Sequence, residues 1–436
     1  METPPRRRRR TREVVAYCLF DFANSSYTTL IITVVFAVYF RNVVVGAADN
    51  TGDRLWGIAN FIAMAIVALG SPLLGALADY SGRRKRLLVL TTLQTVVATA
   101  LLALVGPGDL VLAMALYIIG TVGFEAGYSF YNAFLPDVST PTTVGRISGW
   151  AWAVGYVGGL ACLLLAKPLI DPPLHDAAGA LQPAAVVARQ RSFLLVAAFY
   201  LIFAMPAFLW LRESAPLGRI RRWSEYGSIG LKRVIETLSD LRRYRETAKF
   251  VVASLLFNDG ITTIISFSAI YATTTFGFES GELVWLFLVL NGVAFPGAVG
   301  AGHLSDRIGP KKTILLTLLL WVAVVITGAM ATGRAAFWIM ATGAALGMGS
   351  TQAVGRSFMA QITPPDREAE FFGFYVLAGK FASMFGPLIF GLVSAGTGSQ
   401  RLAVLSLLPF FLAGFAVMVS INESRAIRDA SSPSGT

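Results

Sequence analysis

A small set of polar side chains in this sequence lies inside long apolar runs, where they could do chemistry. Burying a charge away from water is costly unless it is paired and hydrogen-bonded, so each such residue needs a partner, water or a function. The candidates for substrate binding or coupling are Asp21, Asn24, Glu125, Tyr128, Asn132, Asn258, Asp259, Gln352, Arg356 and Lys380.

Their spacing places several of them on shared helical faces. Glu125, Tyr128 and Asn132 recur three and four residues apart, as do Asp21, Ser25 and Thr28, and residues so spaced lie on one side of a helix. Asn258 with Thr262 gives a similar stripe, and Gln352 and Arg356 are four residues apart. Polar stripes of this kind typically line a water-filled path.

The charges suggest a dipolar ligand. A solute with an ammonium and a carboxylate needs an anionic and a cationic contact, and we expect Glu125 or Asp259 to supply the first. Arg356 or Lys380 would supply the second. The alternative, which the sequence leaves open, is that these cations neutralise Asp259, Glu125 or Asp137 in structural pairs. Glu125 and Asp21 are also candidates for proton coupling, since alternating exposure would load and unload a carboxyl group.

No enzyme motif accompanies these residues. The sequence lacks a phosphate-binding G-x-x-x-x-G-K-[ST] loop and an H-E-x-x-H metal motif, and Cys18, Cys162, His175 and His303 are isolated from one another. We therefore predict neither catalysis nor ATP-driven pumping, and no cofactor, metal or disulfide.

The elements that carry these residues are predicted to be membrane helices. The 436 residues are 55% hydrophobic and 14% charged, whereas a soluble domain carries roughly 25% charged residues. Apolar runs of about 20 residues, enough to cross a bilayer as a helix, predict an all-α integral membrane protein. The twelve predicted transmembrane helices cover 14–40, 55–78, 87–106, 110–134, 147–168, 193–211, 249–276, 283–304, 313–333, 335–359, 369–395 and 401–421.

The basic residues predict the orientation. The net charge of +11 comes from Lys and Arg residues clustered between apolar runs, so the expected partner is the lipid bilayer and not nucleic acid. Most of these cations fall on one side of the predicted topology. The exceptions are Arg41, Arg54, Lys167, Arg189, Arg191, Arg334 and Arg401. The positive-inside rule thus predicts cytoplasmic termini in a multi-pass protein of the cell membrane, which we expect to be monomeric.

The helices group into two halves. We predict a basic cytoplasmic N-terminus at 1–13, a six-helix bundle at 14–212, a cytoplasmic linker at 213–248, a second six-helix bundle at 249–421 and a cytoplasmic tail at 422–436. Within the linker, apolar residues at helical spacing are flanked by cations, which favours an amphipathic helix on the membrane surface over a solvated tether. No cleavage signal follows the basic start, so the first helix is expected to be retained.

An internal repeat supports this division. GALADYSGRRK, from Gly75 to Lys85, matches GHLSDRIGPKK, from Gly302 to Lys312, at a constant separation of 227 residues. The matched pairs are Gly75 with Gly302, Asp79 with Asp306, Gly82 with Gly309 and Lys85 with Lys312, with Arg84 and Lys311 as neighbouring cations. Each copy follows the second helix of its half. Glycines allow close helix approach, so the loops are expected to latch helices in one conformation; the alternative is that they only fix topology.

Two six-helix halves with this loop in each resemble the major facilitator superfamily. More narrowly, FDFANSS from Phe20, FYNAFLPD from Phe130, GRISGWAWAVGYVGG from Gly145, FNDG from Phe257 and FGPLIFG from Phe385 resemble the vacuolar effluxer branch, which includes autophagy-related amino-acid exporters and bacterial members. Two departures, Tyr80 and Pro310, stand where the superfamily loop usually has basic residues.

The resemblance implies function as well as fold. It implies a pseudo-symmetric pair of bundles with helices one and four of each half lining a cavity. It also implies secondary active or facilitative transport by alternating access, with export of small polar solutes such as amino acids. Transport of a sugar, nucleoside, drug or peptide, a channel, and a receptor that does not transport remain alternatives.

Overall fold

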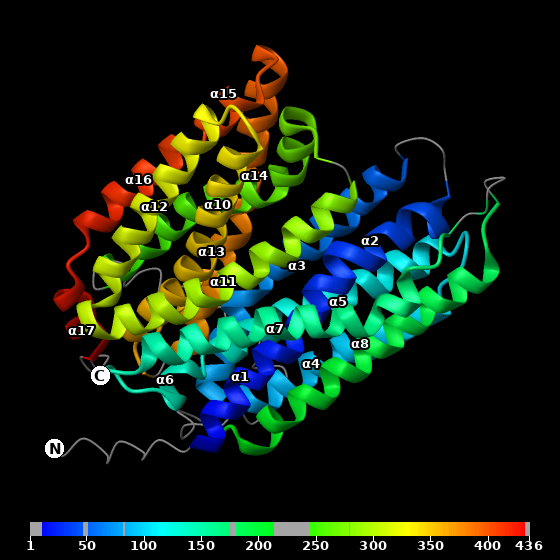
Figure 1. Cartoon of the computed structure of the whole chain (residues 1–436). Helices are drawn as coiled ribbons and strands as arrows, with labels where there is room; N and C mark the ends of the chain where they lie inside the picture. Colours follow the sequence, from blue (N-terminus) through cyan, green and yellow to red (C-terminus); the bar gives the residue numbers. More distant parts are fainter. Residues whose placement is uncertain are drawn as a thin grey trace. The chain divides into compact units, whose positions relative to one another are not determined.

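The computed structural model describes residues 11–46, 51–81, 83–174, 176, 180–212, 244–278, 280–365 and 367–431. Its regular structure in these residues is helical (Figure 1). The first half contains α1 (Thr11–Ser26), η1 (Tyr27–Val34), α2 (Val35–Tyr39), η2 (Phe40–Val45), α3 (Thr51–Ser81), α4 (Arg84–Leu101), η3 (Leu102–Leu104), α5 (Leu110–Asn132), α6 (Leu135–Val138), α7 (Val144–Ile170) and α8 (Pro183–Trp210). The second half contains α10 (Arg245–Phe276), α11 (Ser280–Ile308), α12 (Pro310–Met330), α13 (Arg334–Ile362), α14 (Glu368–Thr397), α15 (Gln400–Leu405), α16 (Leu408–Ser420) and α17 (Glu423–Ser431).

Among the described segments, eight are long and apolar enough to cross a membrane. They are Thr11–Val45, Arg84–Leu104, Leu110–Val138, Val144–Ile170, Pro183–Trp210, Arg245–Ser268, Pro310–Met330 and Gln400–Ser420. The other four predicted spans coincide with α3, α11, α13 and α14, which are 29 to 31 residues long. The chain is thus an all-helical multi-pass membrane protein, and the count of twelve spans stays a prediction.

The helices form two compact units. The first contains residues 1–69, 82–139 and 154–215, and the second contains 70–81, 140–153 and 216–436. In the first unit α1 packs on α8, and α4 packs on α5 and α8; in the second, α10 packs on α14 and α16, and α13 packs on α11 and α12. The last turns of α3 and the first turns of α7 group with the second unit, although both helices lie in the first half of the sequence. The predicted linker helix lies outside the described residues.

The first membrane segment is less regular than its sequence suggests. Residues Tyr27–Val34 and Phe40–Val45 form π-helix, which has wider turns than α-helix. The Thr33 hydroxyl donates to the Thr28 carbonyl, five residues back, at 2.9 Å, which is the separation that a π-turn brings together. Such wide turns often occur at functional positions.

A short amphipathic helix, α17, occupies most of the predicted tail. The Arg425 N–H donates to the Asn422 side-chain oxygen at 3.0 Å, which is the contact of an N-terminal helix cap. Ala426 and Ala430, four residues apart, form its buried face. The tail is therefore folded against the second unit from Glu423 to Ser431.

Candidate functional site

Two buried acids mark a polar region of the first unit. Asp21 on α1 and Glu125 on α5 are 4% and 5% exposed, although both lie in segments able to span a membrane. The Asn24 amide donates to Asp21 Oδ1 at 3.2 Å, and Asn132, two turns after Glu125, is also buried. The predicted stripes of α1 and α5 thus belong to one packed unit.

The same two helices, α1 and α5, also carry stacked aromatic rings. Tyr131 stacks on Tyr17 at 4.2 Å and on Phe20 at 4.7 Å between ring centroids, and Tyr128 lies 6.2 Å from Tyr131. Tyr128 also stacks with Phe124. Ring faces attract cations, and so do carboxylates, so α1 and α5 carry two kinds of group that favour a positively charged partner such as an ammonium. We define Asp21, Asn24, Glu125, Tyr128 and Asn132 as the acidic region of the first unit.

The second unit brings together two of the predicted amides. The Gln352 amide on α13 donates to Asn258 Oδ1 on α10 at 3.3 Å. Asp259, the next residue, is fully buried and accepts a hydrogen bond from the Gly386 N–H on α14 at 2.8 Å. The side chain of Lys380 lies outside those that the structure describes.

Arg356 bonds to a helix backbone. Its guanidinium donates to the Ser148 hydroxyl at 3.0 Å and to the Ser148 carbonyl at 2.9 Å, and lies over the Trp152 ring. The Ser148 hydroxyl in turn donates to the Ala353 carbonyl at 2.6 Å. All four residues belong to the second unit. Arg356, only 2% exposed, thus joins α13 to the first turns of α7.

The second copy of the repeated loop acts as a helix cap. Asp306 accepts hydrogen bonds from the backbone N–H groups of Gly145 and Arg146, at 2.8 and 3.0 Å. These donors are in the first turn of α7, where a negative charge is stabilised by the helix dipole. Gly302 packs so closely that a Cβ there would lie 2.6 Å from the Gly145 carbonyl oxygen.

The first copy shows the same close packing at its glycine. A Cβ on Gly75 would lie 2.2 Å from the carbonyl oxygen of Ala369, in the first turn of α14. Gly82 and the side chain of Asp79 lie outside the described residues. Each loop glycine therefore contacts the start of a helix from the other half of the sequence, α14 for Gly75 and α7 for Gly302.

The lysines of the two loops hold the last long helix of their own half. Lys85 donates to the Leu211 carbonyl at the end of α8, at 2.8 Å, and Lys311 donates to the Val419 and Ile421 carbonyls at the end of α16. The structural counterpart of Lys85 is therefore Lys311 and not Lys312. The structural alignment of the two loops is shifted by one residue from the sequence alignment at this position. The reason is that α4 begins at Arg84, whereas α12 begins directly after Gly309, at Pro310.

This shift explains one of the two departures. Arg84, the first residue of α4, donates to the Ala133 carbonyl at 2.9 Å and pairs with Asp137 at 3.4 Å. Pro310, the first residue of α12, has no side chain that could repeat these contacts, but its fixed φ suits a first helical position. The two loops are thus built differently at this residue.

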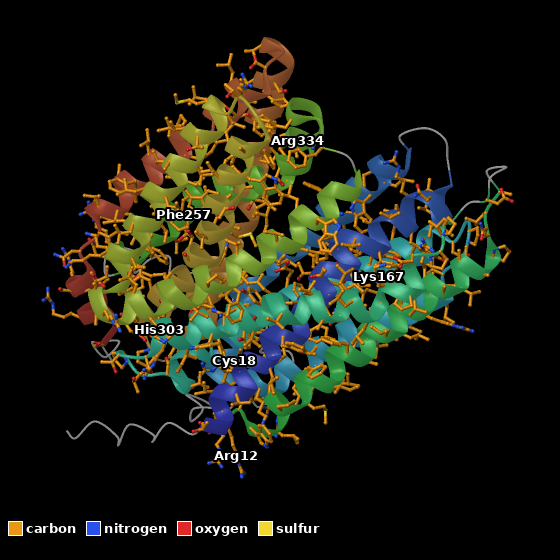
Figure 2. The ribbon with its side chains drawn as sticks, in the orientation of Figure 1. Arg12, Cys18, Lys167, Phe257, His303 and Arg334 are labelled. Atoms are coloured by element: carbon orange, nitrogen blue, oxygen red, sulfur yellow. The ribbon has the colours of Figure 1, made fainter. Side chains whose placement is uncertain are left out.

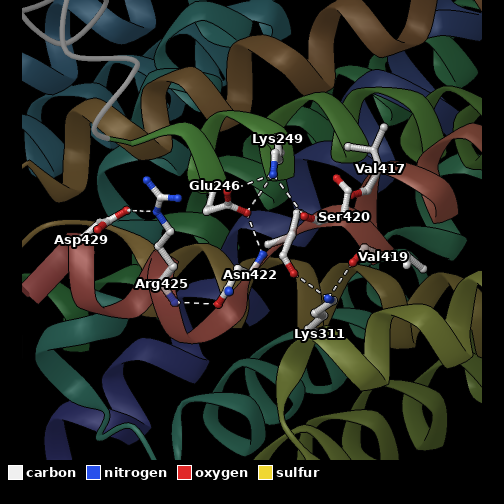
Figure 3. A network of polar contacts seen from close by, with 10 residues as sticks. Glu246, Lys249, Lys311, Val417, Val419, Ser420, Asn422, Arg425 and Asp429 are labelled. Carbon is white, nitrogen blue, oxygen red and sulfur yellow. Dashed lines mark hydrogen bonds and ion pairs between the residues drawn. The ribbon is translucent and has the colours of Figure 1, made fainter.

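A second polar network, which the sequence analysis missed, surrounds the start of α17 (Figure 3). Glu246 on α10 accepts the Asn422 N–H at 2.7 Å and the Lys249 ammonium at 2.9 Å. Lys249 also donates to the Ser420 carbonyl at 3.1 Å. Asn422 followed by Glu423 is a helix-start signal that could have predicted α17.

The cysteines and the described histidine take no part in a cluster. Cys18 and Cys162 form no disulfide. His303, on α11 (Figure 2), has its Nδ1 2.8 Å from the Val299 carbonyl of its own helix. Among the described residues, no three His, Cys, Asp or Glu side chains are placed to hold a metal ion.

The fold defines the class of the protein. Solved structures that match it include a Major Facilitator Superfamily transporter, FucP, crystallised in the outward conformation, with a TM-score of 0.75 and 16% identity over 94% of this chain and 98% of that one. This confirms the predicted fold: the chain has the architecture of a major facilitator transporter.

The sequence comparisons define the family. The family described as vacuole effluxer Atg22 like matches residues 57–431, and the chain belongs to it. An uncharacterized MFS-type transporter, YxiO of Bacillus subtilis, is 29% identical over 95% of this chain and 96% of its own length. Autophagy-related protein 22-1 of Penicillium rubens is 25% identical over 65% of this chain, which spans half of that longer protein.

Proposed function

We propose that this transporter exports small dipolar solutes, with amino acids as the substrate class, by alternating access. The observation that carries the proposal is the acidic region of the first unit, where Asp21 and Glu125 are buried on α1 and α5, the two helices that also carry the stacked rings of Tyr17 and Tyr131. Carboxylates and ring faces both favour an ammonium group. The family's description as a vacuole effluxer supports export.

Amino acids suit this region better than sugars do. A sugar offers hydroxyl groups, which gain little from two buried acids, whereas an ammonium forms charge-assisted hydrogen bonds that are roughly twice as strong as neutral ones. In this proposal Glu125 and Asp21 bind the ammonium, and Asn24 and Asn132 orient it.

Ligand-induced thermal stabilisation of the purified protein tests the substrate class. The panel contains amino acids, their N-acetylated forms, amines without a carboxylate, dipeptides, sugars and nucleosides. We expect amino acids to raise the unfolding temperature, because a ligand that binds only the folded state stabilises it by mass action. N-acetylation removes the positive charge and should abolish the shift. A response to sugars or nucleosides alone would remove the amino-acid proposal.

The matched variants are Glu125→Gln and Asp171→Asn. Asp171 pairs with Lys167 at an exposed position, 55% accessible, near the end of α7, so its replacement removes a carboxylate far along the chain from the acidic region. We expect Glu125→Gln to lose stabilisation by amino acids while Asp171→Asn keeps it. Equal stabilisation of the two variants would show that Glu125 does not contact the ligand.

A further inference from the structure

Asp259 is a buried acid with very few partners. Its side chain is 0% exposed. Oδ1 accepts the Gly386 N–H at 2.8 Å, and Oδ2 has no hydrogen-bond partner among the described residues. Asp306 of the second repeated loop is different, since it accepts two backbone N–H groups and pairs with Arg146.

The carboxyl group lies in a tight seam between α10 and α14. A Cβ on Gly386 would lie 2.1 Å from Thr263 Oγ1 and 2.8 Å from Asp259 Oδ1, so only glycine fits there. The Thr263 hydroxyl, itself fully buried, donates to the Asp259 backbone carbonyl at 2.7 Å. That hydroxyl is therefore committed to the backbone and cannot serve the carboxylate.

Among the side chains that the structure describes on the surrounding helices, no cation pairs with Asp259. Those packed on α10 are α11, α13, α14, α15, α16 and α17. Their charged or titratable side chains are Glu282, His303, Asp306 and Arg307 on α11, Arg334 and Arg356 on α13, Glu368, Glu370, Tyr375 and Lys380 on α14, Arg401 on α15, and Glu423, Arg425, Arg428 and Asp429 on α17, whereas α16 has none. None of the described side chains in this set hydrogen-bonds or pairs with Asp259, and Arg356 is bonded to Ser148.

We propose that Asp259 is a proton-binding site, which takes up a proton when α10 and α14 close at Gly386 and releases it when this seam opens to water. A carboxylate with one hydrogen bond in an apolar seam is strongly disfavoured, and protonation removes its charge. A metal cation is a poorer fit, because hard cations need about six oxygen ligands and the described seam offers one free carboxyl oxygen. The step moves a proton from hydronium to the carboxylate, which leaves water and a neutral acid.

The site would couple transport to a proton gradient. That consequence rests on the proposed function, but proton binding itself does not. Infrared spectroscopy of the full chain in lipid therefore tests the site without any substrate. At neutral pH we expect the carbonyl band of a protonated carboxyl group, lost in Asp259→Asn and kept in Asp171→Asn. The amide oxygen of Asn can still accept the Gly386 N–H, and Asp259→Ser is a second variant with a smaller polar side chain.

Three results would overturn the assignment. The first is the absence of the band from the wild-type protein. The second is its retention in Asp259→Asn and Asp259→Ser with loss in Glu125→Gln, which would place the proton on Glu125. The third is removal of the band by sodium ions but not by choline, which would indicate a metal-cation site. If the band behaves as expected but no solute is transported, the proposed function fails and the proton site stands.

Discussion

At the scale of single residues, Lys85 and Lys311 show how a repeated sequence motif is used twice. Each is the second residue of its helix and donates to carbonyls at the end of α8 or α16. The last carbonyls of a helix have no partner within the helix, so a lysine ammonium satisfies groups that would otherwise be unpaired. The neighbouring Lys312 is exposed.

This difference gives a paired test with Lys311→Met and Lys312→Met. The first variant loses charge-assisted hydrogen bonds worth about 1.5 to 3 kcal/mol, whereas the second loses an exposed charge. We expect a lower unfolding temperature for Lys311→Met and little change for Lys312→Met, measured by thermal unfolding in one detergent. A lower unfolding temperature for Lys312→Met than for Lys311→Met would contradict the assignment of Lys311 as the structural counterpart of Lys85.

Glu423 gives a test by pH. Burial raises the pKa of its carboxyl group, although the Lys311 backbone N–H and the positive charges of Lys311 and Lys312 oppose this shift. A carboxyl group with a raised pKa in the folded state stabilises the fold most below its unfolded pKa and loses that contribution as pH rises through the folded value. We therefore expect Glu423→Gln to unfold at a higher temperature than wild type at neutral pH. The difference should shrink as pH falls toward 4.5, the ordinary value, and a difference that grew on acidification would contradict the raised pKa.

At the scale of helices, the apolar runs predicted where the long segments lie but not their internal form. Length and hydropathy report burial in lipid, so α4, α10 and α12 coincide with their predicted ranges within a few residues. The π-turns of η1 and η2 and the one-residue shift between α4 and α12 depend on packing and on where each helix begins. A local apolar count does not contain that information.

The loop glycines provide a test of helix packing. A Cβ on Gly302 would collide with the Gly145 carbonyl, while a Cβ on Gly300, on the same helix, meets open space. Gly302→Ala should therefore destabilise the protein. Gly300→Ala should be neutral or stabilising by up to about 1 kcal/mol, since alanine favours helix. Thermal unfolding of both variants decides between these outcomes, and equal stability would show that α7 does not pack on Gly302.

At the scale of the whole molecule, residues 70–81 and 140–153 group with the second compact unit, although they lie in the first half of the sequence. Asp306, Ser148 and Arg356 make the contacts that hold one end of α7 there. The buried acids and cations can be singled out from the sequence because charged residues are rare in apolar runs. Their partners Ser148 and Gly386 cannot be, because serine and glycine are common in such runs and these two contact residues that are distant in sequence.

The most direct test of the proposed function is solute exchange by purified protein in proteoliposomes. We expect vesicles preloaded with an amino acid to take up the labelled amino acid, with Asp171→Asn equal to wild type. Loss of a charge-assisted contact worth about 1.5 to 3 kcal/mol should slow exchange by Glu125→Gln at least tenfold. Exchange of amino acids at wild-type rates by Glu125→Gln would contradict an ammonium contact at Glu125, and exchange restricted to sugars or nucleosides would contradict the proposed substrate class.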